Sequence, residues 1–303
     1  MIVSKTVSVK VPASTANLGP GFDCLAIALQ LWNTVEVSLA QRPSVTIRGL
    51  GSNILAKDTS NLIYQTTQLL CQKLSINNTH FSIKCTNSIP VGKGLGSSSA
   101  AIIAGLGSTN YLLGSPCSAN ELLAIAADIE GHPDNVAAAL LGGCQIVTKK
   151  DDQLITSQIN LPSALTCVLF VPNKTLSTQY SRGKLPKKVS MEDAVFNIGH
   201  VALLVDALNN SKLDQITIAT EDRLHQPIRS KLFTAFKYIT EAAKKAGALG
   251  AVLSGGGPTV LALTTDREMT IGYEMADAAK LLGVCGEVMI LRPTNKGIII
   301  NPS

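Results

Sequence analysis

A glycine- and serine-rich stretch at residues 89–106, IPVGKGLGSSSAAIIAGL, constrains the fold of this chain more than any other feature. Glycine and serine add little to a packed core, so this backbone is left bare for a purpose other than burial. Small apolar helix formers follow at once and predict a helix from Ser97 to about Leu113. The stretch therefore predicts a loop that leads directly into a long helix.

The loop has the properties of a phosphate-binding site. Gly92, Gly94 and Gly96 can adopt positive φ and let a ligand come close to the backbone. The N–H groups of Gly96, Ser97 and Ser98 would then point outward at the helix start, where the helix dipole favours an anion. The serine hydroxyls can cap the helix, bind phosphate oxygens or hold a divalent cation.

Three common glycine-rich motifs do not match the loop. Lys93 precedes the glycines that matter, unlike the lysine of a Walker A motif, and the final glycine spacing differs from the dinucleotide motif. Ala100 stands where a nucleophile elbow requires glycine. A glycine-rich helix entry without any ligand is therefore an alternative for the loop taken alone.

Composition indicates a folded protein that acts on a small molecule. The chain has 303 residues, of which 46% are hydrophobic and 16% charged, and this length favours two domains. The net charge is +5, but basic residues are scattered and aromatic residues make up only 4%, so we expect no nucleic-acid partner. A mild positive charge suits an anionic small substrate better.

The cysteines and the N-terminal residues indicate a cytoplasmic location. The seven cysteines occur singly, without a CxxC pair, so neither a disulfide framework nor a zinc site is expected. Residues 1–12, MIVSKTVSVKVP, alternate like a strand and lack the apolar core of a signal peptide. No run reaches about 18 uninterrupted apolar residues, so we expect no membrane partner.

The first half of the chain mixes strands and helices. Period-two alternation predicts strands at 7–11, 34–40, 44–50 and 81–86. Helices are predicted at 61–74, 97–113 and 118–130. Residues 143–159 are expected to form a hairpin that turns at Asp151–Asp152.

The second half has a different order of predicted strands and helices. Its pattern predicts a strand at 165–172, a helix from a capping box at Ser190 to about 208, a further helix interrupted near Pro227, a strand–turn–strand unit at 250–263, a helix at 266–283 and a last strand at 287–293. This order predicts an α+β fold in which helices cover an antiparallel sheet. We place the domain boundary near 158–162.

Two further segments share the polar, glycine-rich character of the loop. They are VPASTANLGPGFDCLAIAL at 11–29 and LSGGGPTVLAL at 253–263. With the loop between them, they resemble in order the three motifs of the GHMP kinases, small-molecule kinases that transfer the γ-phosphoryl group of ATP. PASTANLGPGFD resembles the homoserine kinase branch in particular, since it lacks the basic residue that mevalonate kinases and galactokinases carry there. The resemblance covers essentially the whole chain.

The resemblance implies a two-domain GHMP-kinase fold. Residues 1–160 would form an ATP-binding domain with a left-handed βαβ unit, and residues 161–303 a ferredoxin-like domain. The left-handed crossover contradicts the usual rule, so the resemblance alone implies it. The element order of the second half agrees independently with the ferredoxin-like part.

The resemblance also implies the reaction and its participants. The chain would be an enzyme that uses ATP and Mg²⁺ to phosphorylate L-homoserine to O-phospho-L-homoserine, a step of threonine biosynthesis. A homodimer would be an assembly common in the family.

The resemblance assigns the nucleotide and metal residues. Residues 90–101 would wrap the phosphates, with these positions at the nucleotide: Pro90, Val91, Gly92, Lys93, Gly94, Leu95, Gly96, Ser97, Ser98 and Ser99. Ser98 and Glu130 match the Mg²⁺ ligands, and two oxygen groups suit an ion that takes few protein ligands. Asn61 resembles an adenine-contacting asparagine, although a polar residue there can also cap a helix.

A homoserine-sized substrate presents a carboxylate, an ammonium and a hydroxyl. For the carboxylate, Arg182 and Arg229 match the family's arginine positions, and Arg223 is a weaker candidate. The ammonium would face Asp23 and Asn17, although Asp23 could instead cap a helix that follows it.

Two further residues are expected at the substrate. Gly256, in the SGGGP turn, would bring backbone against the substrate from the second domain, and Thr178 would line the same site. The active site would then lie between the domains, as small-molecule pockets often do.

The attacking hydroxyl is expected to meet the segment GHPDNV. His132 and Asn135 would hold it, with His132 in a positioning role by resemblance. Asp134 is adjacent and could instead be a general base, and both assignments stay open. Phosphoryl transfer tolerates a missing base, because its transition state depends mainly on alignment and charge neutralisation. His200 and His225 are expected to be structural.

Two rival functions make different predictions. A GHMP kinase for a hydroxy acid such as mevalonate would not need Asp23, because that substrate has no ammonium group. A non-catalytic amino-acid or nucleotide sensor on the same fold would be stabilised by its ligand without producing ADP.

Overall fold

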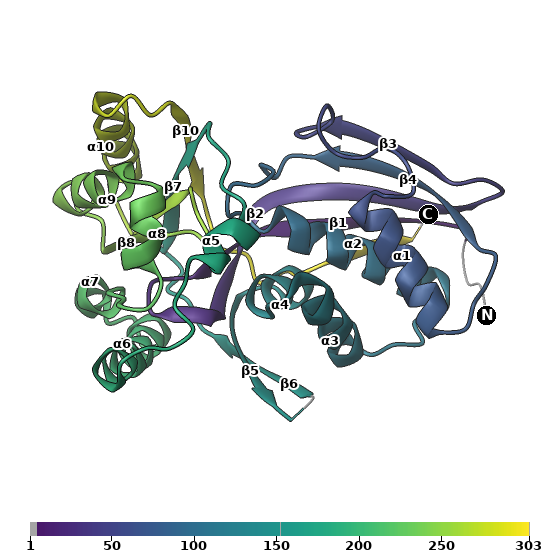
Figure 1. Cartoon of the computed structure of the whole chain (residues 1–303), viewed down its shortest axis with the longest axis horizontal. Coiled ribbons are helices and arrows are strands. Elements are labelled where there is room, and N and C mark those ends of the chain that lie inside the picture. The colour runs from purple at the N-terminus through teal and green to yellow at the C-terminus, as the bar shows by residue number, and fades with distance from the viewer. Residues whose placement is uncertain (1–4, 152, 303) are drawn as a thin grey trace.

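The computed structural model describes residues 5–151 and 153–302, which form two lobes side by side (Figure 1). One lobe is built on a seven-stranded sheet and the other on a four-stranded sheet, counted within these described ranges. Helices pack on both sheets, which confirms the predicted two-domain α+β fold. The hairpin expected at 143–159 is present, although Asp152 of its turn lies outside the described residues.

The sheet of the first lobe is organised around two long strands. In the described part of the chain, its members are β1 (Thr6–Asn17), β2 (Gly21–Ala40), β3 (Ser44–Gly49), β4 (His80–Asn87), β5 (Cys144–Lys150), β6 (Gln153–Ile159) and β11 (Ile299–Pro302). β1 and β2 pair antiparallel along almost their whole length. β2 also pairs with two other strands: residues 34–40 pair with β4, and residues 25–27 pair with β5. β3 lies parallel to β4.

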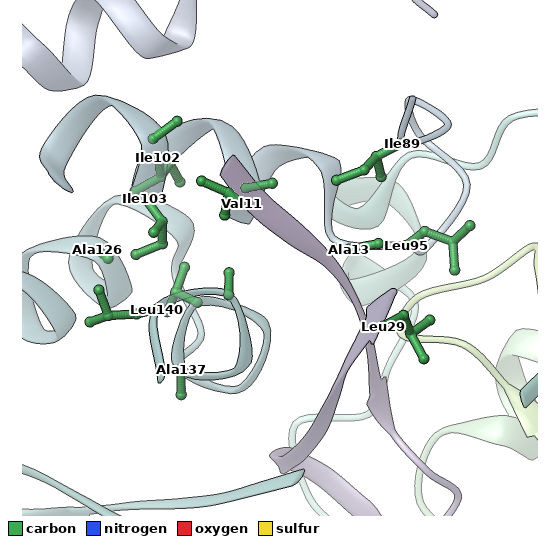
Figure 2. Packing of buried hydrophobic residues seen from close by; sticks show 14 of the residues in the cluster. Val11, Ala13, Leu29, Ile89, Leu95, Ile102, Ile103, Ala126, Ala137 and Leu140 are labelled. Atoms are coloured by element: carbon green, nitrogen blue, oxygen red, sulfur yellow. The ribbon is translucent and has the colours of Figure 1, made fainter. Parts of the chain in front are cut away.

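Four helices pack against this sheet on one side (Figure 1). They are α1 (Leu62–Lys73), α2 (Ser97–Leu112), α3 (Ala119–Glu130) and α4 (Asp134–Leu141). α2 is central: Figure 2 shows its residues Ile102 and Ile103 near Val11 of β1, with Ala126 of α3 and Leu140 of α4 in the same cluster. α2 is enclosed by β1 and the other helices. Most of its side chains are therefore small, and most of its residues are buried.

The second lobe has the ferredoxin-like strand order. Its strands are β7 (Thr166–Pro172), β8 (Gly250–Leu253), β9 (Val260–Thr264) and β10 (Gly286–Leu291), paired antiparallel in the order β10-β7-β9-β8. α9 (Ala235–Lys245) and α10 (Glu268–Leu281) pack on this sheet around a second apolar cluster. The prediction of this half as strand, helices, two strands, helix, strand is confirmed.

The helices between β7 and β8 differ in detail from the prediction. In chain order they are α5 (Thr178–Gly183), α6 (Met191–Asn209), a 3-10 turn (Leu213–Gln215), α7 (Ile216–Ala219) and α8 (Gln226–Leu232), followed by α9. Ser190 caps α6 as expected, because its hydroxyl accepts a hydrogen bond from the Asp193 amide. Pro227 lies in the first turn of α8, where a missing N–H costs nothing, and a break between helices falls at residues 233–234.

Two observations in the first lobe were not predicted. Residues 21–40 form one continuous strand, so no helix follows Asp23, and the alternative that Asp23 caps such a helix is wrong. The C-terminal strand β11 returns from the second lobe and pairs antiparallel with β1, with Val7 opposite Pro302. Figure 1 accordingly places the C-terminus in the lobe that contains β1. The division at residue 160 stays a prediction, with β11 beyond it in the chain.

Within residues 5–151 and 153–302, no helix combines the length and apolar character that a bilayer span requires.

Candidate active site

A cavity of about 470 Å³ lies where the three glycine-rich segments meet. It brings together most of the residues that the sequence predicts for the site: Asn17, Asp23, Asn61, Val91, Gly92, Lys93, Gly94, Gly96, Ser97, Ser98, Glu130, His132, Asp134, Asn135, Arg182, Arg229 and Gly256. Pro90, Leu95 and Ser99 do not line it, and Leu95 and Ser99 are buried. The backbone of Thr178 begins α5, but its side chain lies outside the described part of the structure.

Hydrogen bonds tie the three segments to one another. The Ser254 hydroxyl donates to the Gly94 carbonyl at 2.6 Å and lies 2.8 Å from the Thr15 hydroxyl. Asn17 Nδ2 donates to the Gly255 carbonyl at 2.9 Å, and the Gly255 amide donates to the Ala16 carbonyl. The turn at 254–258 therefore closes the cavity from the second lobe.

Gly94 shows how tightly these segments approach. Its φ is +78°, and a Cβ built there would lie 2.3 Å from the Ser254 carbonyl oxygen. Any side chain would separate the phosphate loop from the 254–258 turn, so glycine is required.

The N-terminus of α2 has the geometry that the predicted anion site requires. Gly96 is its N-cap in the left-handed conformation, with φ +69°, and no side chain caps the helix among the described residues. Ser97 and Ser98, in the first turn, line the cavity. The unpaired amides and the dipole of this 16-residue helix therefore face the cavity and favour a phosphate group.

Oxygen groups suited to a hard cation lie beside this helix start. Ser98 Oγ is 2.6 Å and Ser99 Oγ 2.9 Å from Oε1 of Glu130, the last residue of α3. The described residues contain no cluster of three or more His, Cys, Asp or Glu side chains able to hold a metal. The serine hydroxyls and the Glu130 carboxylate fit Mg²⁺ better than a metal that needs a full set of protein ligands, because Mg²⁺ takes few protein ligands.

A second polar group forms at the start of α4. Oδ1 of Asp134 is 2.7 Å from His132 Nδ1 and accepts a hydrogen bond from the Asn135 amide at 2.7 Å. Burial lowers the pKa of His132, but the hydrogen bond and charge of Asp134, with the charge of Glu130, outweigh it and leave that pKa raised. His132 Nε2 lies 3.9 Å from Glu130 Oε1, and the Asn135 amide oxygen accepts from the Ser14 hydroxyl.

Two residues predicted for opposite ends of a substrate bind each other. Arg182 from α5 contacts both carboxylate oxygens of Asp23, at 2.6 and 2.7 Å. The hydrogen bonds that Asp23 accepts from Arg182 raise the pKa of Arg182 further. Asn17 Oδ1 accepts a hydrogen bond from the backbone N–H of Asp23. This bond holds the Asp23 backbone in its left-handed conformation.

Arg229 is the most deeply buried charge of the cavity. Its side chain is 1% exposed, and burial, with repulsion from Arg182, lowers its pKa to about 10. Its Nε–H has no partner among the described residues. The Phe22 ring lies 5.3 Å from the Arg182 guanidinium carbon and 5.4 Å from that of Arg229. A buried cation with an unpaired donor favours an anionic ligand.

Two predicted nucleotide residues also have structural partners. Asn61 caps α1, because its Oδ1 accepts from the Ile63 amide at 3.0 Å and its Nδ2 donates to the Ala56 carbonyl. The amine of Lys93 donates to the carbonyls of Pro172 and Asn173, at the end of β7. Lys93 therefore ties the phosphate loop to the second lobe.

Sequence reasoning missed several residues of the site. Phe22 stacks on His225 and faces both arginines, and Ser14 supports Asn135. His225 contacts Nη1 of Arg229, and Asp222 accepts a hydrogen bond from the backbone N–H of His225. The only signal in the sequence is the spacing of His225 and Arg229, which puts them on one face of a helix.

Comparison with known proteins identifies the class. Residues 61–143 match the N-terminal domain of the GHMP kinases, and residues 199–271 match the GHMP kinase C-terminal domain. The chain belongs to the GHMP kinase family and is a small-molecule kinase that uses ATP.

Within the family, two similar relatives are homoserine kinases. Homoserine kinase of Moorella thermoacetica is 41% identical over 96% of this chain and 99% of that protein. Homoserine kinase of Synechocystis sp. is 39% identical over 99% of both proteins.

Solved structures support the same family assignment. The crystal structure of homoserine kinase from Cytophaga hutchinsonii superposes with a TM-score of 0.88 at 29% identity, over 99% of both chains. Mevalonate kinase of L. major has a TM-score of 0.69 at 14% identity, so it shares the fold alone.

Proposed function

We propose that this chain transfers the γ-phosphoryl group of ATP to the hydroxyl of L-homoserine and produces O-phospho-L-homoserine for threonine biosynthesis. The observation that carries the proposal is one cavity in which the α2 N-terminus lies with Asp23, Arg182 and Arg229. The α2 N-terminus suits a polyphosphate, and the three charged side chains suit a small zwitterion. The homoserine kinases that are 39–41% identical over almost the whole chain support the same reaction.

ATP would occupy the part of the cavity bordered by the phosphate loop and the start of α1. The amides at residues 96–98 would bind its phosphates, with Asn61 at the adenine end. Ser98 and Glu130 would hold Mg²⁺, which when bound neutralises the charge of the phosphates.

Homoserine would occupy the part bordered by both lobes. Arg229 offers a buried cation for its carboxylate, and Asp23 an acceptor for its ammonium group. Arg182 would contact both Asp23 and the carboxylate, so the existing ion pair would become part of the binding site. Mevalonate has no ammonium group and would leave Asp23 unused.

His132 and Asn135 would align the hydroxyl for attack on phosphorus. Asp134 binds His132 Nδ1 and the Asn135 amide through one oxygen, which supports a role in fixing both residues rather than taking the proton itself. His132 Nε2 is then the ring nitrogen left for the substrate. Alignment and charge neutralisation would supply most of the rate.

ADP release in a coupled assay with ATP and MgCl₂ tests the proposal. We expect turnover that depends on L-homoserine, with mevalonate at least about a hundredfold less effective in kcat/KM because the interaction of Asp23 with the substrate ammonium group is lost. Turnover with mevalonate alone would support the hydroxy-acid kinase. Thermal stabilisation by homoserine without ADP release would support the sensor.

Three further predictions belong to this proposal. We propose a cytoplasmic enzyme that forms a homodimer and binds no nucleic acid. Light scattering after size exclusion tests the dimer, and fluorescence anisotropy with labelled DNA and RNA tests the last point.

A further inference from the structure

A buried histidine connects Arg229 to the first motif. His225 is fully buried at the N-cap of α8, one helical turn before Arg229. Its Nε2 lies 2.8 Å from the Gly19 carbonyl oxygen, in the turn between β1 and β2. Its Nδ1 lies 3.1 Å from Nη1 of Arg229.

These two partners determine the protonation of His225. A carbonyl oxygen only accepts, so Nε2 carries a hydrogen and donates it to Gly19. An arginine nitrogen only donates, so Nδ1 is the bare nitrogen and accepts from Arg229. The ring is therefore neutral, and burial lowers the pKa of His225 in the direction that this state requires.

The contact determines which edge of Arg229 is available. In the described part of the chain, both hydrogen bonds of its guanidinium use Nη1, to His225 Nδ1 and to the Gly255 carbonyl at 3.1 Å. Nε remains buried without a partner. Nε and Nη2 form the edge that a carboxylate binds with two parallel hydrogen bonds.

Asp222 holds the backbone of His225, and its Oδ2 also lies 3.5 Å from Nε2 of the ring. Its carboxylate is fully buried and accepts the amides of Leu224, His225 and Gln226 at 2.6–3.1 Å. It also accepts Asn197 Nδ2 from α6 at 2.8 Å. The His225 ring stacks on Phe22, with centroids 5.3 Å apart. The imidazole therefore has little freedom to rotate.

We infer that His225 is a positioning residue, which accepts from Nη1 of Arg229 and thereby aims the Nε–Nη2 edge at the carboxylate of the amino-acid substrate. The inference rests on the proposed function and deepens it. His225 touches no substrate atom, and its effect passes through Arg229. The substrate-binding arginine is thus anchored to the turn of the first motif.

Two substitutions separate this role from a packing role. His225→Asn keeps an acceptor near the position of Nδ1 and loses the Gly19 contact. His225→Gln reaches the position of Nε2, keeps the Gly19 contact and loses the acceptor for Arg229. We expect His225→Gln to raise the KM for L-homoserine about tenfold, because a hydrogen bond to a charged group is lost. The KM for ATP should change less than about twofold, and His225→Asn should stay within about threefold of the wild type.

A matched control and a cycle complete the test. His200 also stacks on a phenylalanine, Phe196, but does not line the cavity, so His200→Gln should leave both KM values unchanged. Adding His225→Gln to an Arg229→Lys variant should raise the homoserine KM no further, because the two residues act as a unit.

The outcomes are distinguishable. If both His225 variants raise the KM for ATP and homoserine alike, in step with a lower Tm, His225 only packs and the inference is overturned. If they leave the homoserine KM unchanged, it is overturned as well. If the wild type shows no homoserine-dependent ADP release, the proposed function fails and the inference with it.

Discussion

Glu130 illustrates how single residues divide the work in this cavity. Its Oε1 accepts hydrogen bonds from two serines of α2, so one carboxylate serves two hydroxyls at the phosphate end. At the substrate end, Asp23 is bound by both terminal nitrogens of Arg182. His132 stands between the two ends, 3.9 Å from Glu130 and 2.7 Å from Asp134. Each of these three carboxylates thus has polar partners that hold it in place.

The charge of Glu130 should be essential for turnover. Glu130→Gln keeps the size and the hydrogen bonds but loses the charge, so we expect kcat to fall about a hundredfold or more, with a higher Mg²⁺ requirement. Steady-state kinetics over a MgCl₂ titration measures both. Glu121→Gln on the same helix, which affects only the capping box with Ser118, should keep wild-type kcat. Equal kcat and Mg²⁺ dependence for Glu130→Gln would contradict this assignment.

His132 should make a pH-dependent contribution to stability. Its pKa is raised in the folded state, so its contribution is fully present below the unfolded value of 6.5 and is lost as pH rises through the folded value. The free energy of unfolding of the wild type, minus that of His132→Gln, should therefore decrease as pH rises from 6 through 8. Urea unfolding of both proteins across this range measures the difference, and the subtraction cancels the other histidines. A difference independent of pH would refute the raised pKa.

At the scale of elements, the site depends on how closely three loops approach. The loop before α2, the turn between β1 and β2 and the turn at 254–258 are joined by backbone and serine hydrogen bonds. The helix that follows the first of these loops is buried on most sides, so its N-terminus cannot move independently of the sheet. The position of the α2 N-terminus, where we propose that phosphate binds, is thus set by packing far from it.

Gly94→Ala tests this approach. The new Cβ would meet the Ser254 carbonyl at 2.3 Å, so we expect the loops to separate, the KM to rise for both ATP and homoserine, and stability to fall by about 2 kcal/mol or more. Gly283→Ala is the control, because its φ is also positive but no atom lies within 4 Å, and it should cost only about 1 kcal/mol. Urea unfolding and steady-state kinetics compare the two. Equal effects would mean that the loops are not in close contact.

At the scale of the whole molecule, one apolar cluster extends across both lobes, beside the second cluster under α9 and α10. Residues of β1 and β2 belong to the same buried cluster as residues of β7 and α6. The chain crosses between the lobes again near its end, where β11 pairs with β1. Ile298, just before β11, packs on this core, and its amide donates to the Leu140 carbonyl of α4. The C-terminal residues therefore pack on and pair with the lobe that contains α2.

Ile298→Ala should destabilise that lobe. Removing a half-buried isoleucine side chain should lower the free energy of unfolding by about 2 kcal/mol. Ile300→Ala in β11, where the side chain is 37% exposed, should cost about 0.5 kcal/mol or less. Urea unfolding measures both. If Ile298→Ala is as mild as Ile300→Ala, the return of the chain contributes little to stability.

The sequence alone predicted the features that depend on neighbouring residues. Alternation predicted strands of the first sheet, the pattern of the second half predicted the strands of the second sheet, and the glycines before Ser97 predicted a loop that leads into a helix. The family resemblance added the site residues, seventeen of which line the cavity. It did not separate the roles of Asp134 and Asn135. The two residues are adjacent at the start of α4, and only the directions of their side chains distinguish them.

Tertiary structure decided the features that depend on distant residues. The Asp23–Arg182 pair joins residues 159 positions apart, and the Gly19–His225 contact joins residues 206 apart. β11 is too short and too exposed to carry a clear pattern, and only its pairing with β1 defines it. Local patterns determine φ, ψ and burial along one element, whereas the direction of a side chain toward a partner depends on how separate elements pack. For this reason the sequence could name Arg229 as a ligand residue, but only the folded chain placed His225 behind it.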